Sequence, residues 1–417
     1  MSVSEDLDEV RTRARGCATS APARSHGGPG RGLPFHRPAL RLSINGKFLS
    51  AGPTGVHRTA FELVNALDRA LTRQPVSTRS EITLLMPRDA RPIPALVAIE
   101  QRVVGRSTGQ LWEQLSLPAA ARGTLLMNFC NLGPVLVRDC LTMVHDAMFV
   151  TSPASYPVAF RWKYRATMPW IGRRHRAVLT VSEHSRHELA EVGICPPERC
   201  HVVHNGVEHV REVGPDDDLR RRLGLEPGRY ALALASTVPR KNVRTFLEAF
   251  SGGALPGLRP VLYGTASLGD FLRAGIAVPA RTVFAGAVSD AELGGLMRSA
   301  LALCFPSTAE GFGLPPLEAM SLGCPAIVAP RAALPEVCGE GALYAAPDDP
   351  AAWARCLERL AEDPALARRM TERGLARAAR FTWPAAAERV LALAAAVAAV
   401  QAGADAAPPE SGIGDEA

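Results

Sequence analysis

Short apolar runs alternate with amphipathic stretches along most of the chain. The stretch VHRTAFELVNALDRAL repeats apolar residues at helical spacing and predicts a helix whose stripe is Val56, Ala60, Leu63, Val64 and Leu67. The apolar runs are continuous rather than alternating, which is typical of parallel strands that helices cover on both faces. The pattern predicts an α/β protein with strands at 40–44, 81–86, 124–129, 141–145, 177–182, 230–236, 259–264, 282–287, 302–307 and 325–330.

These runs form two series, separated by a charged, Pro-containing segment near residues 206–228. The chain has 417 residues, which suits two domains of ordinary size. We therefore predict two Rossmann-like domains, 39–205 and 206–380, with parallel sheets facing an interdomain cleft, and a helix at 381–400 that crosses back to the first domain. Ligands of such folds bind outside the carboxyl ends of the strands, so a motif that follows a strand is a candidate site.

The terminal segments 1–38 and 401–417 have the composition of disordered chain, and we predict disorder there. The N-terminus lacks the apolar region of a secretory signal. No uninterrupted apolar run reaches the length of a membrane span, and the most apolar segment, 389–400, is predicted to be a buried or docking helix.

Nine cysteines include no C-x-x-C pair, which predicts free thiols in a reducing cytoplasm rather than a disulfide frame or a zinc site. The net charge of +6 favours anionic partners such as phosphates or acidic lipid. Without an RNA-binding aromatic motif, a helix-turn-helix signature or a dense basic stripe, the chain is not expected to bind nucleic acid.

The segment STAEGFGLPPLEAMSLGCP (307–325) follows a predicted strand and carries two glutamates, Glu310 and Glu318. The glycines between them permit a tight turn, and the Pro-Pro pair suits the start of a helix. Free backbone N–H groups of residues 312–314 would then face outward at a positive helix end, which is a seat for phosphate. Glu318, in the first helical turn, is suited to a vicinal diol such as ribose, and Glu310 to a sugar ring. The alternative is a helix cap with a glutamate that the helix dipole favours.

Two cations, Arg240 and Lys241, follow the predicted strand 230–236 at the start of the next helix. Because a helix N-terminus is positive, two cations there are unfavourable unless an anion neutralises them. A diphosphate would supply that charge. A solvated basic turn is the alternative interpretation.

His145 ends the predicted strand LTMVH and Asp146 follows it, a place where a histidine has either a packing or a functional role. The run INGKFLSAGPTGVHRTAFEL reads as strand, glycine-containing loop and helix, with Thr54 as a candidate N-cap. It lacks the G-x-G-x-x-G pattern, so a nicotinamide site is not supported.

Two further motifs have mainly structural interpretations. Ser289 and Glu292 are spaced as a helix capping box. The segment 160–178 mixes arginines and a lysine with Trp162 and Trp170, which suits either a solvated charged face or a contact with anionic lipid.

Together, EGFGLPPLEAMSLGCPAIVAPRAALPEVCGEGALY, PRKN, HDAMF, VLTVSEHSRHEL and VVHNGV resemble the retaining glycosyltransferases of family four, which have the GT-B fold. INGKFL, TGVHR and LWEQLSLP look most like bacterial mannosyltransferase members that build exopolysaccharide or lipopolysaccharide. The resemblance covers about residues 40 to 400.

The resemblance implies a role for each matching residue. Glu310 would contact the donor sugar and be needed for turnover, and Glu318 would hold the ribose hydroxyls. His145 would lie near the donor sugar across the cleft. The other donor-binding residues would be Arg240 and Lys241 on the diphosphate, the amides of Phe312, Gly313 and Leu314, Gly52 and Gly55 in the loop that closes over the phosphates, and Val288 near the nucleobase.

One position departs from the family pattern. Many relatives have arginine where this chain has Ser236. Arg240 and Lys241 must then bear more of the phosphate charge, which leaves Ser236 a hydrogen-bonding role at most.

The expected function is a metal-independent, retaining transfer of a hexose from a nucleotide diphosphate sugar, without a cofactor. GDP-mannose is the leading donor, with UDP-glucose and dTDP-rhamnose open, and the acceptor is a glycan or a polyprenyl-linked saccharide. The expected location is the cytoplasm, with peripheral contact at the inner membrane face left open. The alternatives are a nucleotide-sugar epimerase of the same fold, a glycan phosphorylase, for which no pyridoxal phosphate lysine is evident, and a non-catalytic nucleotide-sugar-binding protein.

Overall fold

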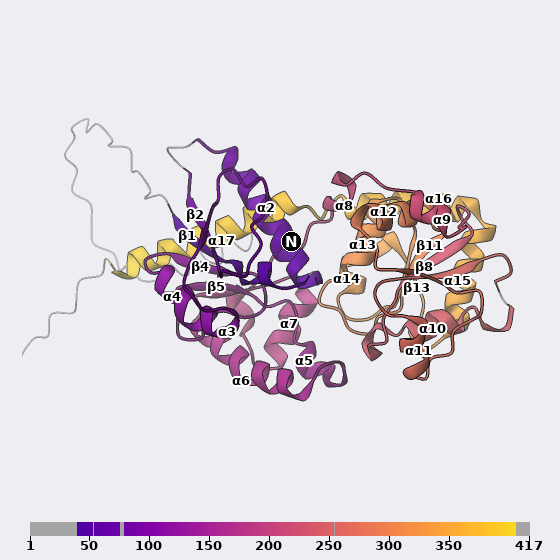
Figure 1. Cartoon of the computed structure of the whole chain (residues 1–417), viewed down its shortest axis with the longest axis horizontal. Helices are drawn as coiled ribbons and strands as arrows, with labels where there is room; N and C mark the ends of the chain where they lie inside the picture. Colours follow the sequence, from indigo (N-terminus) through magenta and orange to yellow (C-terminus); the bar gives the residue numbers. More distant parts are fainter. Residues whose placement is uncertain (1–39, 53, 76–78, 254, 406–417) are drawn as a thin grey trace, which may run out of the picture.

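The computed structural model describes residues 40–405 apart from 53, 76–78 and 254. Of the segments predicted to be disordered, 1–38 and 406–417 lie outside the described residues. For 401–405 the prediction was wrong, because these residues form the end of the last helix. The described chain forms two lobes side by side, each built around a parallel sheet (Figure 1).

The first sheet has seven strands in the order β3-β2-β1-β4-β5-β6-β7, and every pair is parallel. Its strands are β1 (Arg41–Asn45), β2 (Glu81–Met86), β3 (Glu100–Val103), β4 (Leu125–Asn128), β5 (Cys140–Met143), β6 (Ala177–Thr180) and β7 (Cys200–Val202). The helices of this lobe are α2 (Gly55–Thr72), α3 (Gly109–Leu111), α4 (Leu117–Ala120), α5 (Met148–Thr151), α6 (Val158–Arg174) and α7 (Glu183–Glu191).

The second sheet has six parallel strands in the order β10-β9-β8-β11-β12-β13. They are β8 (Tyr230–Leu234), β9 (Arg259–Tyr263), β10 (Val283–Gly286), β11 (Ala302–Phe305), β12 (Ala326–Val328) and β13 (Ala342–Tyr344). The helices that follow the first lobe are α8 (His209–Glu212), α9 (Asp218–Arg222), α10 (Val243–Glu248), α11 (Leu268–Arg273), α12 (Asp290–Ser299), α13 (Leu314–Ser321), α14 (Leu334–Cys338), α15 (Pro350–Glu362), α16 (Pro364–Ala378) and α17 (Trp383–Asp405).

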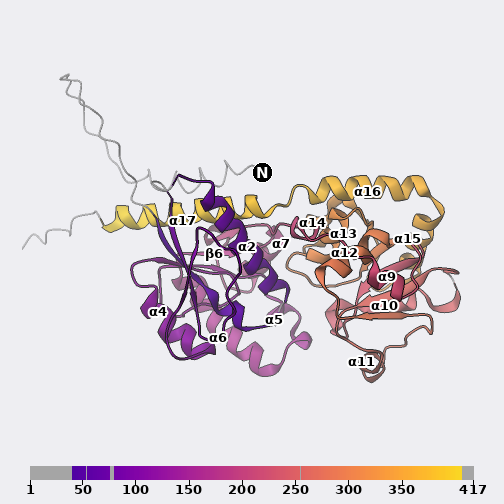
Figure 2. The same ribbon diagram turned by 45° about the horizontal axis from the view of Figure 1, so that its top comes forward.

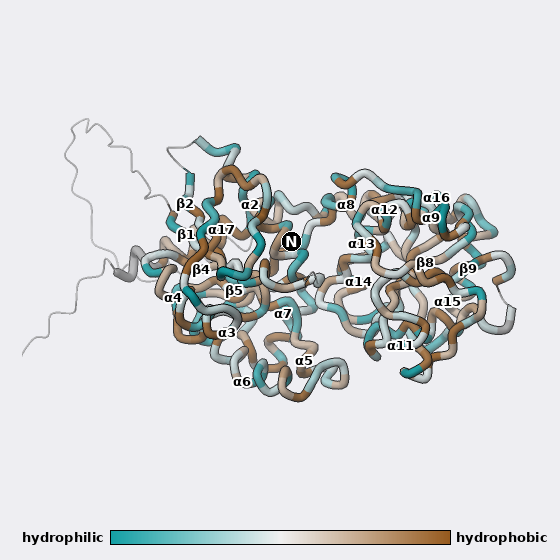
Figure 3. Tube along the Cα trace, viewed as in Figure 1, coloured by the Kyte–Doolittle hydropathy of each residue, from teal (hydrophilic) through white to brown (hydrophobic). Residues whose placement is uncertain are grey.

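Every strand predicted from an apolar run overlaps an observed strand, whereas β3, β7 and β13 were not predicted. All three are edge strands. An edge strand pairs on one side only and needs no continuous apolar run, because part of it faces water. In β3 three of the four residues are exposed, which removes the signal that identified the central strands. Figure 3 shows the apolar character of a central strand such as β8.

The predicted helix caps are confirmed. The Thr54 side chain accepts a hydrogen bond from the N–H of His57 at the start of α2, at 3.3 Å. Ser289 and Glu292 form a reciprocal capping box at the start of α12. These caps satisfy N–H groups that a helix cannot pair internally.

The last helix, α17, lies along the first lobe, where it packs on α2 (Figure 2). It extends to Asp405, beyond residue 400 where the prediction ended it. Its buried residues form a stripe that includes Trp383, Ala387, Val390 and Ala394. By length and composition alone, the helical run Pro364–Val400 is apolar enough to cross a membrane. In the structure, 33% of its most apolar 18-residue window is buried inside the protein.

Gly206 lies where the chain leaves the first lobe and passes the start of α17. A Cβ at Gly206 would lie 2.1 Å from the backbone nitrogen of Trp383. We expect Gly206→Ala to lower the free energy of unfolding by about 1–3 kcal/mol, because the backbone must shift to make room. Urea denaturation measures this. Gly214→Ala is the matched control, since a Cβ there meets nothing within 4 Å; equal stability of the two variants would contradict the prediction.

Candidate active site

The second sheet brings the basic motif, Arg240 and Lys241, close to the acidic motif that carries Glu310. Its strand order reverses direction between β8 and β11, which are neighbours. The loop after β8 carries Arg240 and Lys241, and the loop after β11 carries Glu310. Such a reversal opens a crevice at the carboxyl ends of the strands, where open α/β sheets bind ligands.

A cavity of about 580 Å³ lies at this point between the two lobes. The first lobe contributes the start of α2 and the loops after β4 and β5. The volume falls in the usual range of small-molecule sites. The predicted site residues that line the cavity are Gly55, His145, Arg240, Lys241, Glu310, Phe312, Gly313 and Leu314.

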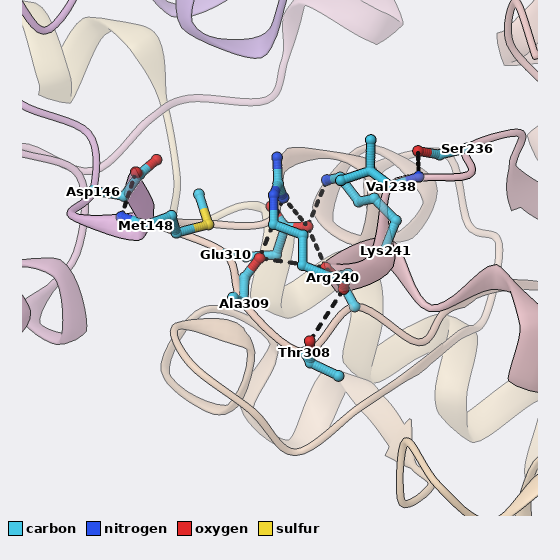
Figure 4. Close-up of polar contacts among 10 residues, drawn as sticks. Asp146, Met148, Ser236, Val238, Arg240, Lys241, Thr308, Ala309 and Glu310 are labelled. Atoms are coloured by element: carbon cyan, nitrogen blue, oxygen red, sulfur yellow. Dashed lines mark hydrogen bonds and ion pairs between the residues drawn. The ribbon is translucent and has the colours of Figure 1, made fainter. Parts of the chain in front are cut away.

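Glu310 is the centre of a compact polar cluster (Figure 4). Its Oε1 accepts hydrogen bonds from the Lys241 Nζ and the Ser307 Oγ, both at 2.5 Å, and the Arg240 Nη1 lies 3.5 Å away. Only about a tenth of the Glu310 side chain is exposed. Among the described residues no partner is present for its Oε2. One carboxylate oxygen is therefore occupied by cations while the other remains free to accept a ligand hydroxyl.

Arg240 and Lys241 form a short 3-10 turn (η6, Pro239–Lys241) instead of the first turn of α10. The turn ends at Asn242, which has a left-handed φ of 50°, and whose Nδ2 donates to the carbonyls of Pro306 and Pro347. Asn242 therefore ties the basic turn to the loop that precedes Glu310. Within the described residues the Nε of Arg240 is buried without a hydrogen-bond partner. Because Arg240 lines the cavity, this unpaired donor is available to an anionic ligand bound there.

The turn that follows Glu310 leads into α13. Gly313 is the N-cap of α13 with φ of 101°, a left-handed conformation that suits glycine. In the part of the chain that the structure describes, no acceptor is found for the N–H groups of Phe312, Gly313 and Leu314. These donors and the helix dipole make the turn a seat for an anion beside the Arg240–Lys241 pair.

Glu318 lies in the second turn of α13 and not in the first, and it does not line the cavity. Its Oε1 accepts a hydrogen bond from the Nε2 of His209 at 3.1 Å. The His209 Nδ1 in turn accepts from the indole N–H of Trp383 at 3.1 Å. In this structure Glu318 therefore connects the site helix to the start of α17.

The remaining three predicted residues also lie off the cavity lining. The Ser236 Oγ accepts a hydrogen bond from the Val238 N–H at 3.3 Å within its own loop. Val288 packs half-buried in the apolar cluster around β9 and α12. The carbonyl of Gly52 is hydrogen-bonded to the Nδ1 of His57 at 2.7 Å, beside the cavity-lining Gly55.

His145 and Asp146 meet the cavity from the first lobe. The Nε2 of His145 donates to the carbonyl of Phe129 at 2.9 Å, and burial lowers the pKa of His145 to about 4. His145 is therefore neutral at physiological pH. The Asp146 Oδ1 accepts from the Met148 N–H, and burial, together with the nearby Glu188 and Glu310, raises the pKa of Asp146 to about 6.

Asp146 therefore predicts a pH dependence of stability. Its pKa is about 6 in the folded state against 3.8 for the unfolded chain, so the folded protein binds more protons between these values. The stability contributed by the protonated form is complete below pH 3.8 and is lost as the pH rises through 6. Relative to Asp146→Asn, we expect the unfolding free energy of the native protein to fall across this window. Urea denaturation at several pH values measures it, and parallel curves for the two proteins would refute the assignment.

An aromatic wall was not anticipated from the sequence. Tyr156, Phe160 and Tyr164 line the cavity from α6 and its approach, with ring centroids 5.2 Å and 4.0 Å apart along the stack. The i, i+4 spacing of the three rings was the available signal. This spacing was overlooked because the arginines and tryptophans of the same region suggested lipid binding instead. Of those tryptophans, Trp162 and Trp170 are 73% and 55% exposed.

Both lobes are similar in sequence to known protein families. Residues 216–377 match the family described as Glycosyl transferases group 1, and residues 131–211 match Glycosyltransferase Family 4. The O-antigen chain mannosyltransferase RfbU of Salmonella typhimurium is 29% identical over 55% of this chain and 63% of its own length. The MMP alpha-(1->4)-mannosyltransferase of Mycolicibacterium hassiacum is 30% identical over 65% of this chain and 67% of its own length.

Solved structures share the fold at lower identity. The sucrose-phosphate synthase of Thermosynechococcus elongatus superimposes with a TM-score of 0.67 at 20% identity, covering 87% of this chain and 100% of that one. HepE of Anabaena in complex with UDP-glucose superimposes with a TM-score of 0.61 at 18% identity, covering 87% and 99%. These likenesses confirm the predicted arrangement of two parallel α/β domains.

Proposed function

The chain belongs to the family-four glycosyltransferases with the GT-B fold, and on that basis we propose that it moves a hexose from a nucleotide diphosphate sugar to a saccharide acceptor with retention of the anomeric configuration. One observation supports this most directly. Arg240, Lys241, the free N–H groups of residues 312–314 and Glu310 converge on a single interdomain cavity.

The second lobe would bind the donor. The diphosphate oxygens would accept hydrogen bonds from the unpaired Arg240 Nε, from the Lys241 ammonium and from the backbone N–H groups of residues 312–314. The same cations contact Glu310 in the free protein, so the diphosphate would draw them from the carboxylate. Glu310 would then accept hydrogen bonds from hydroxyls of the donor sugar at Oε2 and, beside the hydrogen bond from Ser307, at Oε1.

The first lobe would present the acceptor across the cavity. The bond between the sugar C1 and the β-phosphate oxygen breaks, and the acceptor oxygen bonds to C1 on the same face. The acceptor proton passes to the leaving diphosphate oxygen, so the step needs no protein nucleophile. Arg240, Lys241 and the turn amides stabilise the charge that develops on the leaving group, and this is the basis for proposing metal-independent transfer. Closure of the lobes excludes water, which limits hydrolysis of the donor.

The donor proposed is GDP-mannose, because the sequence relatives named above are mannosyltransferases. UDP-glucose is the competing donor, since HepE of Anabaena was solved with it. The acceptor proposed is a glycan or polyprenyl-linked saccharide of cell-surface polysaccharide, by analogy with the O-antigen relative. The proposed location is the cytoplasm, and the exposed Trp162 and Trp170 of α6 are the proposed contact with the inner membrane face.

The test begins with binding. Thermal shift and saturation-transfer NMR against GDP-mannose, UDP-glucose and dTDP-rhamnose, each with and without EDTA, should show stabilisation by one donor that EDTA does not abolish. Proton NMR of slow donor hydrolysis, recorded before mutarotation, should then show the retained anomer. An inverted product would refute the mechanism, and absence of binding by every nucleotide sugar would refute the function. Donor consumption that yields only an epimer would favour the epimerase.

Liposome flotation tests the membrane contact separately. Charge reversal of Arg173 and Arg174 at the end of α6 should reduce flotation with anionic vesicles. Unchanged flotation would remove that part of the proposal.

A further inference from the structure

The first turn of α7 contacts the candidate active site from the opposite lobe. Ser182 is the N-cap of α7, and its Oγ accepts a hydrogen bond from the Ser185 N–H at 3.0 Å. The same Oγ donates to the carbonyl of Gly311 at 2.6 Å. The Ser185 Oγ lies 3.1 Å from the Gly311 carbonyl and 2.9 Å from that of His145, and its single proton is shared between them. Both serine side chains are fully buried.

Gly311 is the residue directly after Glu310, and the contact requires it to be glycine. A Cβ at Gly311 would lie 2.5 Å from the His145 carbonyl. The two serine hydroxyls occupy both lone pairs of the Gly311 carbonyl. The Glu310–Gly311–Phe312 backbone is therefore held by the first lobe, although it belongs to the second.

A second contact holds the same turn of α7. The carboxylate of Glu336 in α14 accepts from the backbone N–H groups of Glu183 at 2.8 Å and His184 at 2.9 Å. His204 donates to it as well, at 3.2 Å. Burial alone would raise the pKa of Glu336, but these hydrogen bonds hold it below its usual value, so the group is ionised at neutral pH.

The segment that carries Glu336 is itself connected to the Glu310 turn. The Ala333 N–H donates to the carbonyl of Glu310 at 3.3 Å, and a Cβ on Gly313 would touch the Leu334 side chain. Arg377 donates to the carbonyls of Glu336 and Val337 and so anchors the other end of α14. The Glu310 turn and α14 are therefore directly connected, and α7 contacts both.

We propose that Ser182 and Ser185 are positioning residues that hold the Glu310–Phe312 backbone in its working geometry only when the two lobes are closed. Opening the lobes breaks the contacts of Gly311 with both serines and those of Glu336 with the N–H groups of α7. An open protein would then bind the donor on the second lobe without a correctly oriented Glu310. The inference rests on the proposed function and goes beyond it, since it couples turnover to closure.

The alternative is an ordinary interface contact that contributes to stability alone. The two interpretations differ in what they predict for kcat. A structural contact lowers the melting temperature and leaves kcat of the folded protein unchanged. A positioning contact lowers kcat at a temperature where the variant is fully folded.

The experiment uses the full chain with the substitutions Ser185→Ala and Ser182→Ala/Ser185→Ala. GDP-mannose hydrolysis supplies kcat and KM, and calorimetry with GDP supplies the affinity. We expect the double variant to lose about 10- to 100-fold in kcat, because a small misplacement of a reacting group has a cost of this order. GDP affinity should change less than about 3-fold, since the diphosphate contacts lie within the second lobe.

Two control variants and one further measurement separate this effect from unfolding. Ser43→Ala removes another buried hydroxyl, one that accepts from Thr124 far from the interface, and should leave kcat unchanged. Ser182→Thr/Ser185→Ala keeps the capping hydroxyl and should restore most of the kcat that the double variant loses. Hydrogen exchange at the Glu183 and His184 amides should accelerate in the double variant, because closure no longer protects them.

Two results would overturn the proposal. The first is a double variant that is folded and turns over GDP-mannose at the native kcat. The second is unchanged exchange at the Glu183 and His184 amides, which decides the coupling even if no nucleotide sugar proves to be a substrate. Failure of every nucleotide sugar to bind the native protein would instead refute the proposed function.

Discussion

Glu310→Gln is expected to lower sugar transfer by about 100- to 1,000-fold, the range seen when a single stabilising group is removed from an active site. At the same time it should bind GDP as tightly as the native protein, or more tightly. The reason is the arrangement in the free protein, where the Lys241 Nζ is 2.5 Å from Glu310. A neutral glutamine competes less with the diphosphate for that cation.

The measurement pairs initial rates with GDP calorimetry on the same preparation. Glu340→Gln is the matched control, because Glu340 is exposed and lies away from this cavity. A weakened affinity for GDP in Glu310→Gln would contradict the competition between carboxylate and diphosphate. Undiminished transfer would show that Glu310 has no part in turnover.

Lys241→Met and Arg240→Met are each expected to weaken GDP binding by about 10- to 100-fold. A charge-assisted hydrogen bond contributes about 1.5–3 kcal/mol, which corresponds to that range. The loss of affinity should be clearer for Arg240→Met, because the Arg240 Nε is buried and has no partner in the described part of the free protein. The affinity of the native protein should also fall as salt is added, and less steeply in either variant.

Arg244→Met provides the control for charge. Arg244 lies one turn further along the chain, is exposed and donates to the carbonyl of Gly275 instead of facing the cavity. GDP affinity that falls equally in Arg244→Met would indicate a general loss of positive potential. Native affinity in both Lys241→Met and Arg240→Met would place the diphosphate elsewhere.

The local pattern of residues accounts for much of the fold and part of the site. Central strands such as β8 and β11 could be predicted because both of their faces are buried and their sequence is therefore continuously apolar. The caps of α2 and α12 were readable because capping involves residues three apart. The Glu310 turn was readable because left-handed backbone and an early proline leave clear marks in the sequence.

Other features were not predicted, either because they depend on partners far away in the chain or because their local pattern is weak. Glu318 resembled a second ligand-binding carboxylate, yet its contact is His209, whose other nitrogen accepts from Trp383 of the last helix. The edge strand β3 carries no apolar run, and the aromatic stack of α6 was hidden among basic residues. Ser182 and Ser185 look like ordinary helix-start residues until Gly311 is found against them.

Local sequence was sufficient for the central strands, the helix caps and the chemical character of the Glu310 turn and the Arg240–Lys241 pair, since hydrogen bonding and burial within a strand or a turn depend on near neighbours. The order of the strands was not encoded locally, and this order is what places β8 beside β11 and their loops on one cavity. The approach of α7 to Gly311 likewise exists only after two separately built sheets have docked. Packing between distant segments depends on the summed burial of many residues, so no short sequence motif predicts which segments come into contact.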